Sequence, residues 1–242
     1  MTQLSVNINK IATLRNSRGG NVPNLLSVVV DLQGYGAQGI TIHPRPDQRH
    51  IKYNDALALP EVLTTEFNIE GNPITKFVDL VNRIKPHQVT LVPDGENAVT
   101  SNAGWDTIKH RDFLNEVISE FQGKGIRTSI FVDPDEKMVE GAKATGTDRI
   151  ELYTEAYAKN YPQNPEKAIA PYVKAAKVAN KLNIGINAGH DLNLENTAFF
   201  AKNIPQLLEV SIGHARLASH FTWALKISFP CIFNDCPNEA IA

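Results

Sequence analysis

The sequence predicts an α/β protein with the fold of a (β/α)8 TIM barrel. Short runs rich in β-branched residues alternate with longer stretches of helical period, and eight such runs occur. The length of 242 residues suits one barrel of this kind. A doubly wound open sheet is the competing architecture. No Gly-x-Gly-x-x-Gly motif follows the first run, which weakens the dinucleotide-binding form of that alternative.

The predicted strands and helices alternate along the whole chain. The strands are expected at 4–8, 39–43, 66–70, 89–93, 127–132, 149–153, 183–188 and 208–212. Apolar residues recur every three or four positions in the helices expected at 74–84, 112–125 and 166–183. The segment 100–112 is longer than a tight turn requires, so we expect a loop or an extra helix there, over the barrel mouth.

Length and composition favour a single domain over residues 1–242. The net charge is −2, so no general positive field is available to bind a nucleic acid or an anionic membrane. No apolar run is long enough for a transmembrane helix and the N-terminus lacks a signal-peptide pattern, so a cytoplasmic protein is expected. The two cysteines form neither a disulfide framework nor a four-ligand zinc site.

Polar side chains gather where the predicted strands end. The active groups of such a barrel lie at the carboxyl ends of its strands. Taken singly, each of these side chains is more often structural than catalytic. Because at least three strands bring a histidine or a carboxylate to the same rim, a catalytic rim is favoured. The residues concerned are Asn7, Asn9, His43, Arg45, His50, Glu70, Glu151, His190 and His214.

The same rim has the features of a phosphate site. Gly189 and Gly213 follow strands seven and eight, where backbone N–H groups commonly approach a phosphate. Arg18 and Arg45, with His50, place positive charge on the other side of the mouth. A guanidinium group matches a phosphate with two parallel hydrogen bonds, so phosphorylated ligands are expected.

A metal ion is not expected at this rim. His43 and His50 are seven residues apart and Glu70 follows, a spacing that matches no common metal signature, and the neighbouring arginines repel a cation. Acid–base chemistry without a cofactor is therefore predicted, with a burial-raised pKa for Glu70. Arg15 and Arg49 are interpreted as ordinary surface residues.

Six motifs follow one another along the chain: VNINKIATLRNSRGG, GITIHPRPDQRHI, FNIEGNP, LVPDGENAVTS, INAGHDL and SIGHA. Together they resemble the pyridoxine 5′-phosphate synthase family. The resemblance extends from about residue 3 to about residue 215. It implies a barrel with extra helices, assembled as a homo-octamer. It also implies condensation of 3-amino-2-oxopropyl phosphate with 1-deoxy-D-xylulose 5-phosphate, which releases phosphate and water.

The resemblance also implies roles for individual residues. His43 and Glu70 would accept protons, His190 would donate one, and Glu151 would stabilise the transition state. The aminoketone phosphate would be held by Asn7, Arg18, Asp191, Gly213 and His214, and the deoxyxylulose phosphate by Asn9, Lys10, Arg45, His50 and Thr100.

Three of these positions depart from the family pattern. Asn9 replaces Asp, Lys10 replaces His and Asp191 replaces Gly. Asn9 and Lys10 still offer hydrogen bonds. A carboxylate repels a phosphate, so Asp191 is expected to contribute its backbone.

Residues from about 216 to 242 are atypical, because Pro230 and Pro237 interrupt the closing helix expected after strand eight. The codons of Phe221 to Ala224 can also be read, one nucleotide out of frame, as Tyr-Leu-Gly. Our hypothesis is a frameshift near residues 215–218, which would make Cys231 and Cys236 artefacts.

Two alternatives remain at this point. One is another phosphosugar-processing TIM-barrel enzyme, either an isomerase or an aldolase, although no Schiff-base lysine is evident at a strand end. The other is a protein that binds a phosphorylated ligand without catalysis, if the atypical tail impairs the barrel. Only the synthase would form an aromatic ring from the two phosphorylated substrates.

Overall fold

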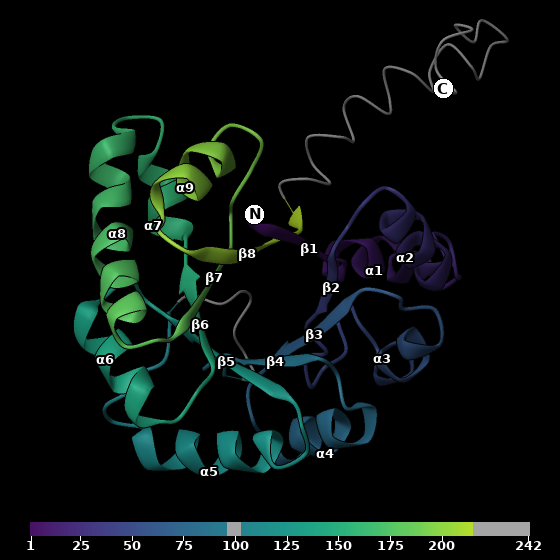
Figure 1. Cartoon of the computed structure of the whole chain (residues 1–242). Helices are drawn as coiled ribbons and strands as arrows, with labels where there is room; N and C mark the ends of the chain where they lie inside the picture. Colours follow the sequence, from purple (N-terminus) through teal and green to yellow (C-terminus); the bar gives the residue numbers. More distant parts are fainter. Residues whose placement is uncertain (96–102, 215–242) are drawn as a thin grey trace, which may run out of the picture.

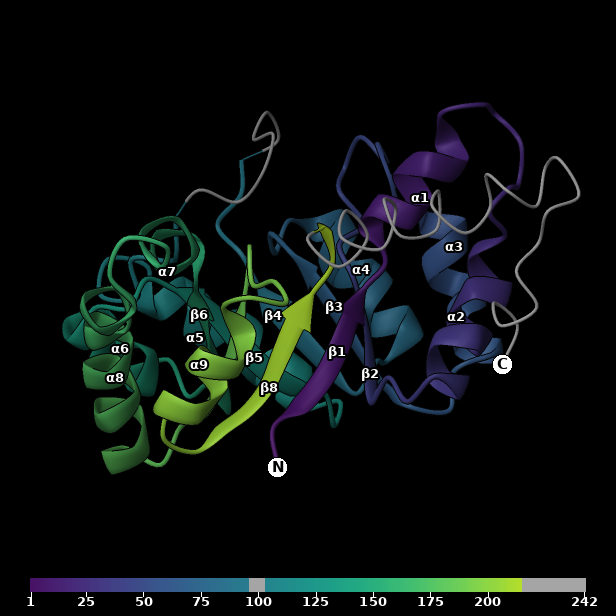
Figure 2. The same cartoon turned by 90° about the horizontal axis from the view of Figure 1, so that it is seen from above.

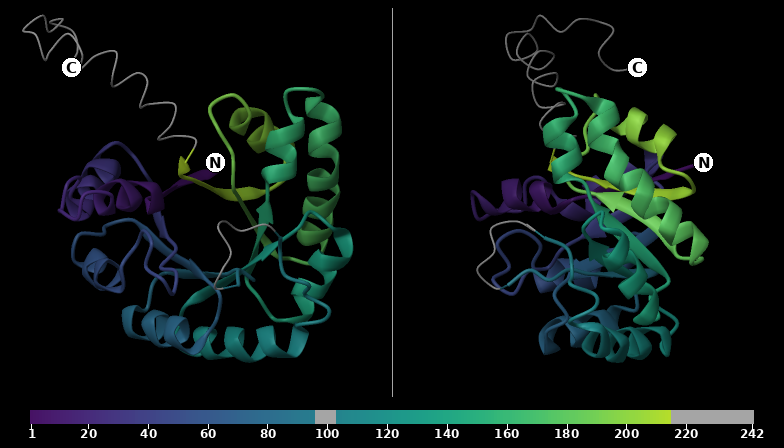
Figure 3. Two further views of the ribbon diagram at one scale, coloured as in Figure 1. Left: turned by 180° about the vertical axis from the view of Figure 1, so that it is seen from behind. Right: turned by 90° about the vertical axis from the view of Figure 1, so that its left-hand side faces the viewer.

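Eight parallel strands close into a barrel in chain order, with β8 paired back to β1 (Figure 1). The structure is a computed structural model that describes residues 1–95 and 103–214. Figure 2 shows β1 and β8 side by side where the barrel closes, and Figure 3 shows helices around the outside of the ring. The predicted TIM barrel is thus confirmed.

Every predicted strand is present, with boundaries that differ by at most two residues. The strands are β1 (Gln3–Asn7), β2 (Gly39–Ile42), β3 (Glu66–Gly71), β4 (Gln88–Leu91), β5 (Arg127–Val132), β6 (Arg149–Tyr153), β7 (Gly185–Gly189) and β8 (Leu207–Ile212). The helices are α1 (Asn9–Asn16), α2 (Leu25–Gly34), α3 (Tyr53–Ala58), α4 (Thr75–Ile84), α5 (Arg111–Gln122), α6 (Glu136–Ala144), α7 (Glu155–Asn160), α8 (Pro165–Lys181) and α9 (Thr197–Asn203).

Among the described residues, two connections carry a pair of α-helices, α1 with α2 and α7 with α8, and α3 is followed by a short 3-10 helix, η1 (Leu59–Glu61). Residues 103–110, before α5, form a turn rather than the extra helix that we considered, and the Trp105 N–H donates to the Phe131 carbonyl at 2.8 Å. Thr100, the frameshift expected near residues 215–218 and the atypical tail from about residue 216 to residue 242 lie outside the described residues. None of the helices in the described parts of the chain has the length and apolarity needed to span a bilayer.

Side chains alternate between the two faces of each strand. The outward side chains are apolar and pack under the helices, as Ile40, Ile69 and Val89 do. Gly71 ends β3 where a Cβ atom would lie 2.2 Å from the Phe77 ring, so the absence of a side chain lets α4 pack closely. These apolar contacts hold the helices against the barrel wall.

The inward side chains are largely polar, unlike the branched aliphatic filling common in such barrels. The Ser5 and Thr41 hydroxyl oxygens lie 2.7 Å apart, Asn68 Nδ2 donates to Thr41 at 3.4 Å, and the Thr90 hydroxyl donates to Asn68 Oδ1 at 3.1 Å. All four residues are buried. A hydrogen-bonded layer therefore lies beneath the carboxyl ends of the strands.

Candidate active site

The four predicted catalytic side chains lie on strands spread around the barrel, at its carboxyl end. His43 follows β2, Glu70 lies near the end of β3, Glu151 lies within β6 and His190 follows β7. His43, Glu70 and Glu151 are buried, whereas the His190 side chain is one-quarter exposed. The barrel thus brings two carboxyl groups and two imidazoles to its mouth.

Asn7 and Asn9 link the first three strands at this mouth. Asn7 Nδ2 donates to Glu70 Oε2 at 3.4 Å, and Asn7 Oδ1 accepts the Asn9 N–H at 3.0 Å. Asn9 Oδ1 in turn accepts the His43 N–H at 2.9 Å. One amide therefore orients Glu70 and the other fixes the backbone of His43.

Burial favours the uncharged forms of both carboxyl groups. Burial raises the pKa of Glu70 well above its usual range, and repulsion from Glu151 and Asp94 adds to this. Burial, followed by repulsion from Glu209, raises the pKa of Glu151 to about 8, against a smaller opposing effect of a hydrogen bond from Thr90. With its pKa at about 8, Glu151 holds a proton at neutral pH and can donate it, and burial shifts Glu70 in the same direction, toward its protonated form.

The pKa values of the two histidines after β2 are shifted downward, opposite to those of the carboxyl groups. Burial and the nearby Arg45 lower the pKa of His43 well below its usual range, and the same causes lower the pKa of His50 to about 4. The Ile51 N–H donates to His50 Nδ1 at 2.9 Å, so the proton of the neutral ring lies on Nε2. Uncharged His43 can accept a proton, and uncharged His50 can donate a hydrogen bond.

Arg45 lies in the site, but it already has a carboxylate partner. Its Nη2 lies 2.5 Å from Asp94 Oδ2, both side chains are buried, and Asn72 Nδ2 donates to the Asp94 carbonyl at 3.0 Å. Asp94 was missed as a site residue, although it stands directly after the fourth predicted strand. A phosphate that reaches Arg45 would have to share the guanidinium group with Asp94.

The interpretation of Arg15 as a surface residue is wrong. Arg15 is only 5% exposed, and its two Nη atoms lie 2.6 and 2.7 Å from the two Asp55 carboxylate oxygens. Asn16 Nδ2 donates to the His50 carbonyl at 2.8 Å, and Arg15 Nη2 approaches the same oxygen at 3.4 Å. The first helix therefore holds the backbone of the loop that carries His50. Arg49, in contrast, is partly exposed and pairs with Asp47.

His190 lies in an unusual backbone conformation. Its φ is +86°, and the φ of Asp191 is +59°, a region that side-chain-bearing residues rarely adopt. Asp191 Oδ2 lies 3.0 Å from His190 Nδ1, and this contact lowers the pKa of the Asp191 carboxyl. The oxygen lies off the line of the ring N–H, so the contact is electrostatic rather than a well-directed hydrogen bond. The Asp191 carboxylate is thus beside the imidazole.

The remaining predicted residues are less enclosed. Lys10 and Arg18 are exposed on and after α1, although the charge of Lys10 contributes to the lowered pKa of His50. A Cβ atom at Gly213 would lie 2.9 Å from the Asn7 carbonyl oxygen, so this glycine permits close contact with β1. His214 is exposed. Gly189 lies against Glu151 rather than in an open phosphate cradle.

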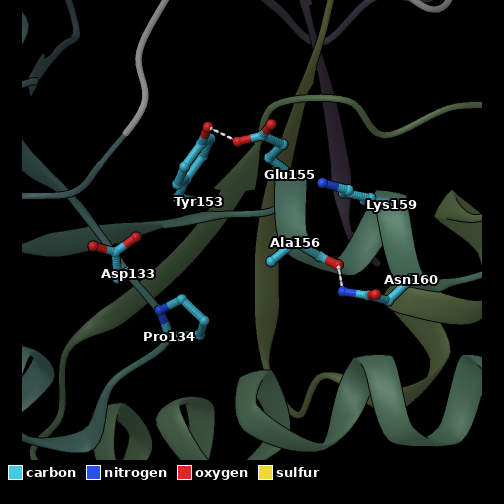
Figure 4. A pocket seen from close by; sticks show the side chains of 7 residues that line it. All are labelled: Asp133, Pro134, Tyr153, Glu155, Ala156, Lys159 and Asn160. Atoms are coloured by element: carbon cyan, nitrogen blue, oxygen red, sulfur yellow. Dashed lines mark hydrogen bonds between the residues drawn. The ribbon is translucent and has the colours of Figure 1, made fainter.

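A cavity of about 360 Å³ adjoins the rim after β5 and β6 (Figure 4). The Tyr153 hydroxyl, which lines it, donates to the Glu155 carboxylate, and the ring of Tyr153 also meets the His190 ring edge-on with 4.9 Å between centroids. Tyr153 therefore separates this cavity from His190. Within residues 1–95 and 103–214, no group of three or more His, Cys, Asp or Glu side chains is arranged to hold a metal ion.

Comparison with known proteins gives a family match. The family described as Pyridoxal phosphate biosynthesis protein PdxJ matches residues 4–227. The Pyridoxine 5'-phosphate synthase of Flavobacterium johnsoniae is 67% identical over 218 residues, which cover 90% of this chain and 92% of the relative. The protein of the same name from Parabacteroides distasonis is 62% identical over 239 residues, which cover 99% of this chain and 100% of the relative.

Solved structures with low sequence identity share the fold alone. A phosphoribosylanthranilate isomerase from Thermotoga maritima gives a TM-score of 0.54 at 16% identity and covers 88% of this chain and 87% of its own. The YdjI aldolase from Escherichia coli K12 gives a TM-score of 0.59 at 12% identity and covers 98% of this chain and 82% of its own. Both matches agree with the closed barrel.

Proposed function

Because this chain belongs to the family described as Pyridoxal phosphate biosynthesis protein PdxJ, we propose that it condenses 3-amino-2-oxopropyl phosphate with 1-deoxy-D-xylulose 5-phosphate. It is an enzyme of vitamin B6 biosynthesis. The proposed product is pyridoxine 5′-phosphate, formed with release of phosphate and water. Membership of this family favours vitamin B6 biosynthesis over the two alternatives, another phosphosugar enzyme and a non-catalytic binding protein. The substrates and the roles of individual residues are our proposal.

The observation that carries the proposal is that the pKa values of the carboxyl groups and of the histidine at the mouth are shifted in opposite directions. Burial raises the pKa of Glu70 and that of Glu151 and so favours their protonated forms, while burial and Arg45 lower the pKa of His43 and favour its unprotonated form. Groups whose pKa values are moved apart are suited to separate donor and acceptor roles. A reaction that joins an amine to a ketone, loses water and closes a ring needs repeated proton transfers of both kinds.

Proton transfer at the amine is the first step that needs a base. The aminoketone arrives as an ammonium ion and must lose a proton before its nitrogen attacks the ketone of the second substrate. We assign this proton to neutral His43 or to Glu70. An ammonium group beside Glu70 favours the ionised carboxylate, so the bound aminoketone opposes the effect of burial and makes Glu70 a better proton acceptor.

Loss of water needs the opposite transfer. The hydroxyl of the carbinolamine leaves as water after it receives a proton, and we assign donation to His190, with Glu151 as the carboxyl that stabilises the transition state. Glu151 lies deeper in the barrel than His190 and is protonated below a pH of about 8. The later steps, loss of phosphate, ring closure and aromatisation, use the same donors and acceptors.

Two phosphate positions on opposite sides of the mouth would orient the reactants. Asn7, Arg18, Asp191, Gly213 and His214 are assigned to the aminoketone phosphate, and Asn9, Lys10, Arg45, His50 and Thr100 to the deoxyxylulose phosphate. Holding both reactants in place lowers the barrier by up to roughly 7–11 kcal/mol in favourable cases. The uncharged His50 supplies a hydrogen bond to phosphate, and Arg45 supplies the charge.

A cytoplasmic homo-octamer without a metal or cofactor completes the proposal. Leu14 and Val30, on α1 and α2, are each 51% exposed and offer apolar surface to a contact between subunits. Light scattering of the purified protein measures the assembly, and a mass far from eight chains would contradict this part.

Substitution of the proposed catalytic groups tests the roles. We expect Glu70→Gln and His190→Asn each to lower kcat by about 100-fold or more, because each removes a proton-transfer group. Binding of the substrates, measured by calorimetry, should change little. Glu140→Gln, an exposed change on α6, serves as the control with wild-type turnover. Near-normal turnover of either site variant would disprove the assigned role.

A further inference from the structure

We propose that Thr154 is a positioning residue for His190. Its hydroxyl holds the backbone on which the imidazole is mounted, and it does not itself touch substrate. The inference rests on the proposed function of His190 as proton donor. Three features of the described residues support it: the hydrogen bonds of Thr154, the helix cap that Thr154 leaves unmade, and the backbone conformation of His190.

Thr154 joins the end of β6 to the end of β7. Its side chain is completely buried. Its hydroxyl donates to the Gly189 carbonyl at 2.6 Å and is also within hydrogen-bond reach of the His190 carbonyl. Its N–H donates to the Gly189 carbonyl at 3.0 Å. Since Tyr153 is the last β6 residue paired with β7, Thr154 extends the connection between the strands to the residues that carry His190.

The hydroxyl of Thr154 does not cap the helix that follows it. Thr154 immediately precedes α7, and a threonine there usually accepts a hydrogen bond from an N–H of the first helical turn. No such side-chain bond is made. The hydroxyl is instead directed across to β7, so the role of Thr154 belongs to the neighbouring strand end rather than to its own helix.

The backbone at His190 requires support of this kind. The positive φ angles of His190 and Asp191 are disfavoured for residues with a side chain, and such conformations persist where surrounding contacts hold them. The His190 carbonyl belongs to the peptide that joins these two residues. By fixing that carbonyl and the preceding one, Thr154 sets the direction in which the His190 side chain leaves the backbone.

Side-chain contacts then define the position of the imidazole itself. The Tyr153 ring meets it edge-on, and the Asp191 carboxylate lies beside Nδ1 at 3.0 Å. Both contacts depend on the backbone direction, because a rotation of the peptide would move the ring away from Tyr153. The two side-chain contacts of His190 therefore depend on the backbone position that Thr154 fixes.

Two substitutions at Thr154 separate the hydroxyl from the shape of the side chain. Thr154→Val keeps the branched shape and removes the hydroxyl, whereas Thr154→Ser keeps the hydroxyl. We expect Thr154→Val to lower kcat by roughly 10- to 100-fold, as displacement of a reacting group does, with KM nearly unchanged. Thr154→Ser should retain most of the wild-type kcat.

Thr145→Val is the matched control. Thr145 is equally buried, and its hydroxyl donates to the Ala142 carbonyl at 2.7 Å. It follows α6, at the end of the barrel opposite to the rim. Removal of the Thr145 hydroxyl therefore removes a buried hydrogen bond to a backbone carbonyl and changes nothing near His190. Wild-type kcat in Thr145→Val beside a reduced kcat in Thr154→Val would support positioning, and an equal reduction in both would overturn it.

A second measurement does not depend on activity. The ring signals of His190 in ¹H–¹³C correlation spectra, assigned by comparison with His190→Asn, should move in Thr154→Val and stay in place in Thr145→Val. Unmoved signals, wild-type kcat in Thr154→Val, or failure of Thr154→Ser to retain activity would each overturn the proposal. If the wild type forms no product, the proposed function fails, whereas a moved His190 signal still supports the positioning role.

Discussion

Gly189 on β7 lies where the carboxyl group of Glu151 on β6 points into the barrel. A Cβ atom at Gly189 would be 2.2 Å from Glu151 Oε1, well inside the contact distance of the two atoms. The glycine is therefore needed for space, since any side chain would push the carboxyl group from its place. The position of the proposed transition-state carboxyl thus depends on a residue of the neighbouring strand.

Gly189→Ala should displace Glu151 and lower kcat by roughly 10-fold or more. The added methyl group should also destabilise the fold by about 1–3 kcal/mol, because the barrel interior is closely packed. Steady-state kinetics and denaturant unfolding measure the two effects. Gly34→Ala is the control, because no atom lies within 4 Å of a Cβ at Gly34. Equal kinetics for the two variants would contradict the packing argument.

The contribution of Glu151 to the free energy of unfolding should fall as the pH rises from about 4.5 to about 8. The pKa of Glu151 is raised from the ordinary value of 4.5 to about 8, so between these values the folded protein holds a proton that the unfolded chain has released. This stabilisation is complete below pH 4.5 and is lost as the pH rises through 8. The free energy of unfolding changes by at most about 1.4 kcal/mol per pH unit for one such group.

Glu151→Gln tests this dependence, because the amide does not titrate. We expect the free energy of unfolding of the variant, measured in urea at several pH values, to fall less steeply than that of the wild type over this range. Glu70 and Glu209 still titrate in the variant and leave part of the slope in place. Identical slopes for the two proteins would show that Glu151 is not held protonated by the fold.

Arg15→Lys should destabilise the protein more than Arg49→Lys does. Both arginines pair with an aspartate, but the Arg15 and Asp55 side chains are 6% and 16% exposed, whereas those of Arg49 and Asp47 are 35% and 45% exposed. Lysine cannot reproduce the two parallel bonds of a guanidinium group. We expect a loss of about 1–3 kcal/mol for the buried pair and close to none for the exposed pair. Equal losses would restore the surface interpretation of Arg15.

The reading frame after His214 is open to a direct check. We propose a single-nucleotide shift near residues 215–218, and therefore expect a different C-terminal sequence in the natural protein, without Cys231 and Cys236. Resequencing of the gene and mass spectrometry of the C-terminal peptides both report on this. A natural peptide that contains Trp223 and Cys231 in the present order would refute the shift.

Local patterns predicted the strands well because alternation and short apolar runs are properties of neighbouring residues. They also placed His43, Glu70, Glu151 and His190 at strand ends, and the barrel brings these ends to one mouth. The roles assigned to them came from the family resemblance and stay predictions.

Contacts between residues far apart in the sequence could not be predicted from local patterns. Arg15 pairs with a residue 40 positions away, and the Thr154 hydroxyl reaches a carbonyl 35 positions away. Nothing in the adjacent sequence distinguishes such an arginine or threonine from a surface one. Asp94 is a partial exception, since it stands directly after the strand predicted at 89–93, as other residues of the rim follow theirs.

The most direct test of the central claim is formation of the aromatic ring. The purified protein is mixed with 3-amino-2-oxopropyl phosphate and 1-deoxy-D-xylulose 5-phosphate, and pyridoxine 5′-phosphate is followed by its absorbance while released phosphate is measured. We predict that the ring compound and inorganic phosphate appear in equal amounts, and that Glu70→Gln lowers the rate at which both form by about 100-fold or more. Intact substrates after incubation with folded protein, or phosphate release without the ring compound, would contradict the proposed function.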